Sequence, residues 1–570
     1  MSKRSSFPAC IRMDVFIRIF LLILSCSSSV FAQPLQIHIS PVPGKRTWKV
    51  TYESVRPMSG LHFQRKVNKF RSSLFVPQQK GVSVIEDGRA ERVLLKTPQK
   101  KISFEFEELI KYLPKDYEFF KSFTDKSVVM YTGHLNACVA EADCDQHSEY
   151  YFTPRKGESL IVDGKVHTTT TKWIDNKQQR GTYVYFGKIK PTQTKHVTFI
   201  TDPGLPIWVS DKINELLSKI FSYYTKHSGH ELSFQPFIFV NYVAENDFAG
   251  RTGGTLPGQV ALSIQGKGWK DADPEKLSGL THFLGHESAH LWNSQMFPAD
   301  SKTMWMHEGG AEIFTFKAMR DLGLASQKEY QEFHDNSLNE CFSASKQRPL
   351  YEVTEDPSFR PFYRCGAIFH LMSEGAVRAK DSLADRFTFW KTLFDYAKAS
   401  GKAYTEEDYF AVLDKLSGDK KTSATIRKLL RDKTVDHKAL YLSELKRLGF
   451  GVQEATPQAI PKSAQLLIAR DLLREIMKKD CGFHGLQVDG NGIQVMSEGQ
   501  CSSLKGDPLI TGIQGKKMEE AYLGVESAQE QCQKPEGVIE LVSFGGKELK
   551  VPCPETFPEK RPYFVFDKML

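Results

Sequence analysis

Several features that mark particular protein classes are missing from this chain of 570 residues. No two cysteines are spaced as C-x-x-C, which argues against a zinc site built from cysteines. No apolar run beyond the N-terminal region is long enough to cross a bilayer, so we expect no transmembrane span. The formal charge of +8 is mild and spread along the chain, which gives no reason to expect a nucleic-acid partner.

The first 32 residues have the pattern of a signal peptide. Basic residues precede a short apolar run, and Val30-Phe31-Ala32 offers a small residue at a cleavage position. We therefore expect an exported protein, periplasmic or secreted after cleavage near Ala32. A lipid anchor at Cys26 is the less favoured alternative, because leucine is unusual at the second position of a lipobox.

One stretch near the middle of the chain holds a full set of side chains for hydrolytic zinc chemistry. His286-Glu287-Ser288-Ala289-His290 places two imidazoles one helical turn apart, so both can reach a single Zn²⁺. Glu287 lies one residue further round the helix, where it can take a proton from water. Glu308 would be the third ligand and would leave an open fourth position, as in catalytic sites. We expect one zinc ion per chain.

Local signals place these residues on two helices. Asp273-Pro274-Glu275 supplies an N-cap, a first-position proline and a first-turn acid. A second helix is expected from about Ser301 or Thr303 to Leu322, with Glu308 in its early turns and Gly323 as its C-cap. Glu312 lies one turn beyond Glu308, where it is either an acid that orients a ligand histidine or a residue that faces solvent.

These motifs resemble the gluzincin metallopeptidases. The run from His286 through Trp292-Asn293 is similar to the H-E-x-x-H-x-W-N of the glycyl aminopeptidase family. Trp305-Met306-His307-Glu308-Gly309 is similar to the W-x-x-E-G of that family and of the aminopeptidase N family. The latter usually leaves eighteen residues before the glutamate, one more than this chain. The resemblance implies an aminopeptidase-like zinc metallopeptidase that acts on a peptide or protein substrate.

A further segment, Tyr363-Arg364-Cys365-Gly366-Ala367, is similar to the Y-x-K-G-A of these peptidases. The resemblance implies that the Tyr363 hydroxyl stabilises the oxyanion of the tetrahedral intermediate. Cys365 stands where those families have lysine. The alternative interpretation is a buried tyrosine at the start of a helix.

The glutamate that binds a substrate amino group in those families has no counterpart here. The corresponding stretch, with Gly253, Gly254 and Thr255 as candidate substrate-binding residues, holds no acid and also suits a Gly/Pro turn between strands. Two alternatives to an aminopeptidase therefore stay open. The chain could be an endopeptidase without an amine anchor, or an inactive peptidase scaffold that binds peptides.

Eight cysteines follow the signal peptide, an even number that suits an oxidising compartment. Among 105 possible connectivities, the favoured local bridges are Cys138–Cys144 and Cys341–Cys365. We expect the second bridge to hold Tyr363 against the helix that contains Cys341.

Residues Gly492 to Val542 resemble a diverged PDZ domain, through the pattern that begins at Gly506-Asp507. The resemblance implies a groove at Cys481–Leu486 that would bind an extended peptide ligand by strand addition. A small β domain held together by cysteines is the alternative.

The expected architecture is a multi-domain α+β protein, because no single core suits a chain of this length. The expected parts are a signal peptide (1–32), an N-terminal β domain (33–201), a thermolysin-like zinc peptidase domain (202–366), an α-helical domain (367–470), a PDZ-like C-terminal domain (471–556) and a C-terminal tail (557–570).

Overall fold

A computed structural model describes most of the chain. The described residues are 34–63, 65, 70–87, 90–108, 117–139, 147–175, 181–245, 249–300, 303–353, 360–482, 485–489, 492–497, 499–558 and 562–570. The predicted signal peptide and its cleavage site, Cys26, Cys144 and two residues of the predicted peptide groove (Phe483 and His484) lie outside them. Among the described residues, no helix combines the length and apolarity needed to cross a membrane.

The chain forms an α+β protein of two compact units. One unit comprises Met1–Glu107, Leu135–Thr153 and Thr171–Arg180, and the other comprises Glu108–His134, Pro154–Thr170 and Gly181–Leu570. The units thus divide the chain differently from the predicted boundary at residue 201. The physical reason is strand pairing. β9 (Ser148–Phe152) and β12 (Thr171–Asp175) join the sheet of β1 (Gln36–Pro41), whereas the two strands between them, β10 (Ser159–Val162) and β11 (Lys165–His167), belong to a separate sheet.

The first unit is built on an eight-stranded sheet in the order β12-β9-β1-β2-β5-β3, with β4 on β5 and β8 on β2. Long antiparallel strands β2 and β5 bury aromatic side chains, including Trp48, Tyr52 and Phe104. The elements of this unit are β1 (Gln36–Pro41), β2 (Thr47–Phe63), α2 (Phe70–Leu74), β3 (Val76–Pro77), β4 (Val82–Asp87), β5 (Ala90–Glu107), β8 (Ala137–Cys138), β9 (Ser148–Phe152) and β12 (Thr171–Asp175).

Two five-stranded sheets open the second unit. The first has the order β11-β10-β13-β7-β6 and the second the order β14-β15-β16-β18-β17. Their strands are β6 (Phe120–Ser122), β7 (Val128–Tyr131), β10 (Ser159–Val162), β11 (Lys165–His167), β13 (Tyr183–Gly187), β14 (Thr192–Gln193), β15 (Thr198–Thr201), β16 (Phe237–Val243), β17 (Gly250–Leu256) and β18 (Gln259–Gln265). β16 begins directly after Pro236. This position is expected for a proline, which has no backbone N–H to donate to a neighbouring strand.

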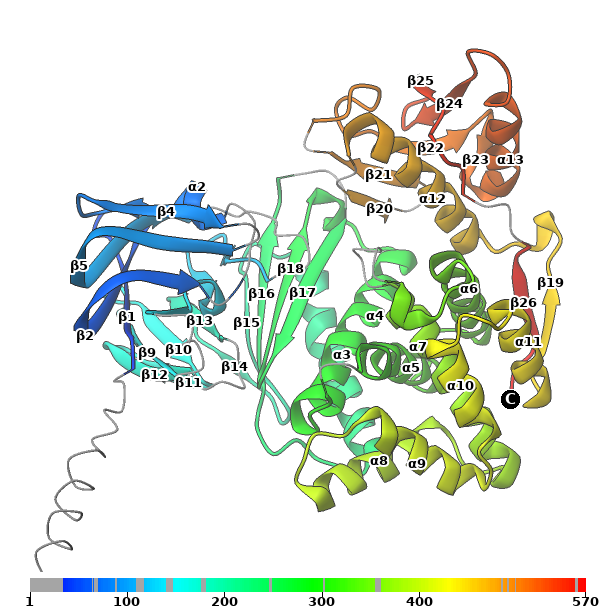
Figure 1. Cartoon of the computed structure of the whole chain (residues 1–570), viewed down its shortest axis with the longest axis horizontal. Coiled ribbons are helices and arrows are strands. Elements are labelled where there is room, and N and C mark those ends of the chain that lie inside the picture. Colours follow the sequence, from blue (N-terminus) through cyan, green and yellow to red (C-terminus); the bar gives the residue numbers. More distant parts are fainter. Residues whose placement is uncertain are drawn as a thin grey trace, which may run out of the picture. The chain divides into compact units, whose positions relative to one another are not determined.

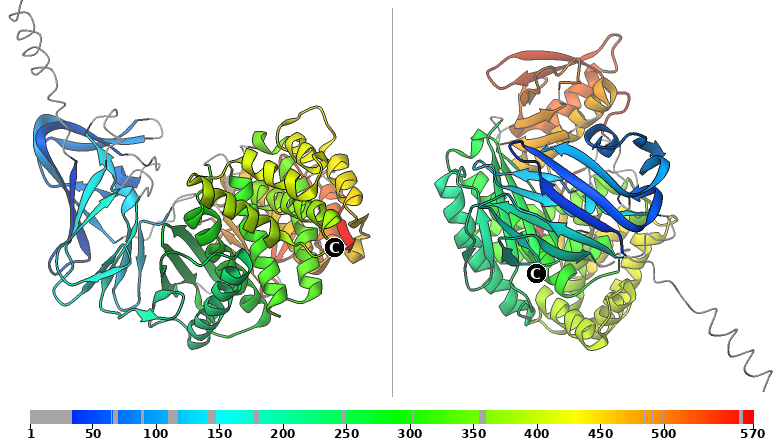
Figure 2. Two further views of the ribbon diagram at one scale, coloured as in Figure 1. Left: turned by 90° about the horizontal axis from the view of Figure 1, so that it is seen from below. Right: turned by 90° about the vertical axis from the view of Figure 1, so that its left-hand side faces the viewer.

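The second of these sheets is covered on both faces, because successive side chains along its strands point to opposite faces and both faces are apolar. Phe237 and Phe239 pack with the first sheet, around Tyr185. Ile238 and Val240 point the other way and join the large core formed with the helices. Figure 1 shows these helices gathered on one side of the β15–β18 strands, and the left view of Figure 2 shows the same arrangement from below. β17 is an edge strand of this sheet.

Helices make up most of the remainder of the second unit. They are α3 (Ile207–Ser228), α4 (Pro274–His290), a π-helical turn (Leu291–Met296), α5 (Met304–Asp321), α6 (Gln327–Ser345), α7 (Arg360–Lys380), α8 (Arg386–Ser400), α9 (Glu406–Ser417), α10 (Lys421–Arg431), α11 (His437–Arg447) and α12 (Lys462–Cys481). After α11, β19 (Gly451–Glu454) pairs antiparallel with β26 (Phe564–Lys568), and the two lie side by side in Figure 1. Part of the segment predicted as a tail is therefore a paired strand.

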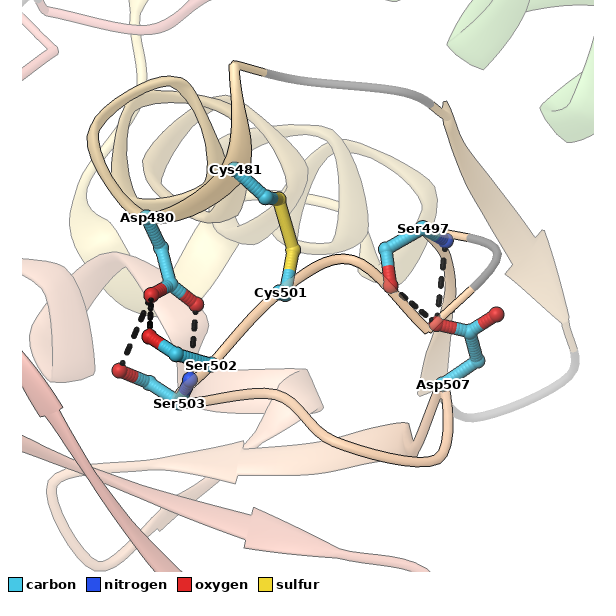
Figure 3. The surroundings of a disulfide bond; sticks show 7 residues. All are labelled: Asp480, Cys481, Ser497, Cys501, Ser502, Ser503 and Asp507. Atoms are coloured by element: carbon cyan, nitrogen blue, oxygen red, sulfur yellow. Dashed lines mark hydrogen bonds between the residues drawn. A yellow bond between two sulfur atoms is a disulfide. The ribbon is translucent and has the colours of Figure 1, made fainter.

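A small β domain follows α12. Its sheet has the order β20-β21-β22-β24-β25, with β23 on β22. Its elements are β20 (Gly485–Asp489), β21 (Gly492–Met496), β22 (Leu509–Ile513), β23 (Lys516–Lys517), α13 (Ala521–Gln531), β24 (Val538–Ser543) and β25 (Glu548–Pro552). Disulfides Cys481–Cys501 and Cys532–Cys553 lie within it. Figure 3 shows the first, which fastens the end of α12 to a loop whose Ser503 also donates its backbone N–H to Asp480 at 2.9 Å.

Candidate active site

Helix α4 begins where the local signals predict. Its N-cap is Asp273, whose carboxylate accepts the backbone N–H of Lys276 at 2.9 Å, and Pro274 is its first residue. His286 and His290 lie in the last two turns, both nearly buried. The helix thus delivers two imidazoles from one face into the protein.

Helices α5 and α7 approach closely through two glycines. A Cβ atom added to Gly309 would lie 2.4 Å from the carbonyl carbon of Gly366, and one added to Gly366 would lie 2.3 Å from the carbonyl oxygen of Trp305. Any larger side chain would push the helices apart. Glu308 precedes the first glycine and Tyr363 lies one turn before the second, so this crossing sets how the two side chains meet.

The three predicted ligand side chains converge on one point. His286 Nε2 and His290 Nε2 are 3.1 Å apart, and each lies 3.3 Å from Glu308 Oε2. Four ligands placed about 2.0–2.1 Å from a tetrahedral zinc ion are separated by roughly 3.3 Å, so the triangle has the dimensions of one face of such a site. Glu308 Oε2 is buried and accepts no well-aligned hydrogen bond. The donor set and the unsatisfied oxygen both fit a bound zinc ion.

Each of the two histidines predicted as ligands is held at its other ring nitrogen. His286 Nδ1 lies 2.9 Å from Glu312 Oε1, and His290 Nδ1 lies 3.2 Å from Asn293 Oδ1. Asn293 in turn donates its side-chain N–H to the backbone carbonyl of His307 at 2.7 Å. Glu312 therefore faces His286 and not solvent. Partners of this kind fix the orientation and tautomer of metal-binding imidazoles.

The edge strand β17 lies along α4 and contacts it in a row, at every second residue of the strand and every fourth residue of the helix. A Cβ atom added to Gly253 would lie 2.6 Å from the Phe283 ring, and one added to Gly279 would lie 2.8 Å from the Arg251 guanidinium. At the end of this row, the Thr255 hydroxyl donates to Glu287 Oε2 at 2.7 Å. The alternative interpretation of the glycines, as a turn between strands, is therefore wrong, because they lie in a strand whose pairing with β18 overrides their local preference.

Gly254 faces the other side of the strand. A Cβ atom there would lie 2.5 Å from the ring of Tyr117, whose hydroxyl donates to the backbone carbonyl of Thr255 at 3.1 Å. Gly253 and Gly254 are therefore in contact with aromatic rings of the protein. Their role in binding substrate stays a prediction.

Tyr363 lies in the first turns of α7 and stacks on His286, with ring centroids 5.5 Å apart and an interplanar angle of 15°. Burial raises the pKa of Tyr363 well above its usual value, and the neighbouring carboxylates of Glu308 and Glu287 raise that pKa further. The phenol is therefore protonated at neutral pH and can donate a hydrogen bond beside the cluster.

The electrostatics of the cluster favour a cation. Burial would raise the pKa of Glu308, but His290 and His286 beside it hold that pKa well below its usual value. Burial would likewise lower the pKa of His286, but Glu308 and Glu312 raise it to about 10. The same field that favours a proton on His286 favours a metal ion placed among the three ligand atoms.

Comparison with solved structures identifies the fold. The crystal structure of an aminopeptidase N family protein from Idiomarina loihiensis matches with a TM-score of 0.59 and 13% identity, covering 94% of this chain and 98% of that one. The chain shares the fold of that protein. An M1 zinc metallopeptidase from Deinococcus radiodurans, in a mutant form bound to the substrate Tyr-Ser-Ala, gives a TM-score of only 0.40 at 14% identity, covering 71% and 94%. No protein-family model and no curated sequence matches the chain.

The predicted disulfide between Cys341 and Cys365 is present and joins α6 to α7, with Cα atoms 4.8 Å apart. Sequence reasoning missed the roles of Thr255 towards Glu287 and of Arg364 towards Glu312, which it contacts at 2.8 Å. No local pattern could have revealed these contacts, because each joins residues more than thirty positions apart.

Proposed function

We propose that this protein is an exported zinc metallopeptidase that hydrolyses peptide bonds, with His286, His290 and Glu308 as ligands of one zinc ion. The observation that carries the proposal is the triangle of ligand atoms with edges of 3.1–3.3 Å around a buried, unsatisfied carboxylate oxygen. The shared fold with an aminopeptidase N family protein supports it. The disulfides are consistent with export.

Zinc, when bound, supplies a Lewis acid that polarises the substrate carbonyl and makes water a better nucleophile at neutral pH. Glu287 accepts the proton of the attacking water and returns it to the leaving amine. Thr255 holds the Glu287 carboxylate in place for both transfers. Tyr363, kept protonated by its surroundings, donates a hydrogen bond to the developing oxyanion.

The resemblance to aminopeptidases favours removal of N-terminal residues, but one observation favours an endopeptidase. β17 runs Gly-Arg-Thr-Gly-Gly-Thr-Leu, so this strand holds no carboxylate for a substrate amino group. The Thr255 hydroxyl is also occupied by Glu287. Among the described residues, therefore, β17 provides no amine anchor.

The C-terminal β domain is a candidate peptide-binding module. β20 lies at the edge of its sheet in the described part of the chain, where an extended peptide could add as a further strand. We propose that a peptide ligand would bind there, beside the Cys481–Cys501 bridge.

The deciding experiment combines metal analysis with a peptide library presented with free and with acetylated amino termini. We expect about one zinc per chain, lost in His290→Ala, and cleavage of the library by the zinc-loaded protein. Preference for free amino termini would identify an aminopeptidase, and equal cleavage of both forms an endopeptidase. Wild-type protein that binds zinc but cleaves nothing would support the inactive scaffold, and failure to bind zinc would refute the site.

A further inference from the structure

A chain of four charged residues, of which Glu312, Glu340 and Arg470 are buried and Arg364 is partly buried, leads away from the candidate metal centre. Glu312, which contacts His286, also accepts from Arg364 Nη1 at 2.8 Å through its second oxygen. Arg364 Nε lies 3.2 Å from Glu340 Oε1, and Glu340 Oε2 lies 3.3 Å from Arg470 Nη2. The charges alternate in sign from the metal cluster to α12.

We propose that Arg364 is a positioning residue, which fixes Glu312 and thereby the ligand His286, and that Glu340 and Arg470 hold Arg364 in place. The inference rests on the proposed zinc site. It adds a function to a residue whose ion pairs are with Glu312 and Glu340 and not with the three proposed ligands.

Arginine suits this position because its guanidinium can contact two carboxylates at once. Arg364 uses Nη1 towards Glu312 and Nε towards Glu340, which lie on different helices, α5 and α6. The side chain of Glu312 is 3% exposed and that of Glu340 is 10% exposed. Removing the guanidinium would take away the positive charge that contacts both buried carboxylates, a costly change that moves the side chains apart or draws in water.

Neighbouring bonds restrict Arg364 further. The residue after it, Cys365, is bonded to Cys341, which is the residue after Glu340. An ion pair and a disulfide thus join α6 and α7 at consecutive positions. The residue before it, Tyr363, stacks on His286. A shift of Arg364 would therefore displace both the orienting acid of His286 and the candidate oxyanion donor.

Arg470 connects this network to the C-terminal β domain. It lies in α12, which is also tied to α6 by a hydrogen bond of 3.0 Å from Asn336 Nδ2 to Ser463 Oγ. The far end of α12 carries the Cys481–Cys501 bridge shown in Figure 3. The helix that introduces the C-terminal domain therefore supplies the outermost charge of the network.

The test uses the full-length protein with Arg364→Met, Arg364→Lys and Arg470→Met. Arg447→Met is the matched control, because Arg447 pairs with buried Glu444 at 2.6 Å in the same unit without contacting the cluster. Zinc affinity is measured by competition with a chelator. The absorption spectrum of the Co²⁺-substituted protein reports the geometry of the ligands independently of turnover.

We expect Arg364→Met to weaken zinc binding by about 10-fold and to change the Co²⁺ spectrum. This is the lower end of the range found when the direct partner of a ligand histidine is lost, because Arg364 acts through that partner, Glu312. Arg364→Lys should give an intermediate loss, because lysine keeps the positive charge but lacks the planar guanidinium that contacts both carboxylates through separate nitrogens. Arg470→Met should give a smaller loss of the same kind, and Arg447→Met none.

Wild-type zinc affinity and an unchanged Co²⁺ spectrum in Arg364→Met would overturn the inference. If that variant does not fold, Arg364→Lys and Arg470→Met decide, and wild-type behaviour in both would overturn it equally. Failure of the proposed function is a separate result, because the wild-type protein itself would then bind no zinc or cleave no peptide.

Discussion

Replacing Thr255 with valine removes one hydroxyl from the candidate active site and leaves a side chain of nearly the same shape. That hydroxyl donates to Glu287 Oε2 at 2.7 Å. A hydrogen bond to a charged group contributes about 1.5–3 kcal/mol, and each 1.4 kcal/mol of transition-state stabilisation corresponds to roughly a tenfold change in rate. We therefore expect kcat to fall by about 10- to 100-fold.

The assay compares steady-state hydrolysis of the best library peptide with the zinc content of the same preparation. Zinc content should not change, because the Thr255 hydroxyl bonds Glu287 and none of the three proposed ligands. Thr255→Ser should recover most of the activity, since it restores the donor. Thr252→Val is the control on the same strand, because the Thr252 hydroxyl contacts Glu118 at 3.4 Å instead.

Unchanged kcat in zinc-loaded Thr255→Val would show that Glu287 does not depend on this contact. An equal loss of kcat in Thr252→Val would show that destabilisation of β17, and not the lost hydrogen bond to Glu287, lowers the activity.

Three further outcomes are expected. Glu287→Gln should keep its zinc but lose at least about 100-fold in turnover, because an amide cannot accept the proton of water; substantial remaining activity would move the chemistry elsewhere. Replacing Cys341 and Cys365 together by serine should lower stability to denaturant by on the order of 3 kcal/mol and reduce turnover more than zinc content; an equal loss of both would contradict a role in placing the tyrosine. Burial raises the pKa of Asp335, which accepts the Phe566 backbone N–H at 2.7 Å, to about 7. A carboxyl group whose pKa is raised on folding contributes stability that is present below about pH 4 and lost as the pH rises through 7, so Asp335→Asn should flatten the pH dependence of urea unfolding in that range.

Local signals predicted the elements that depend on neighbouring residues. The start of α4 at Asp273 and Pro274 follows from capping chemistry, which acts within one turn. The spacing of His286 and His290 likewise places both side chains on one face of a helix. Their convergence with Glu308 follows once a second helix crosses the first.

Features that depend on tertiary contacts could not be predicted in the same way. The glycine-rich run that includes Gly253 and Gly254 has the composition of a turn, yet it forms an edge strand because β18 supplies partners along its length. The contact between Arg364 and Glu340 requires the packing of α6 against α7, which no short pattern specifies. Similarly, the division into two units depends on which distant strands pair.

The glycine crossing of α5 and α7 has a consequence for recognising relatives of this protein. Neither Gly309 nor Gly366 can gain a methyl group unless the two backbones separate, because each would place its Cβ within 2.4 Å of the other helix. The two positions should therefore change together or not at all during divergence. This pair offers an evolutionary signature that is independent of metal chemistry, and it would also be retained in relatives that have lost their ligands but kept the fold.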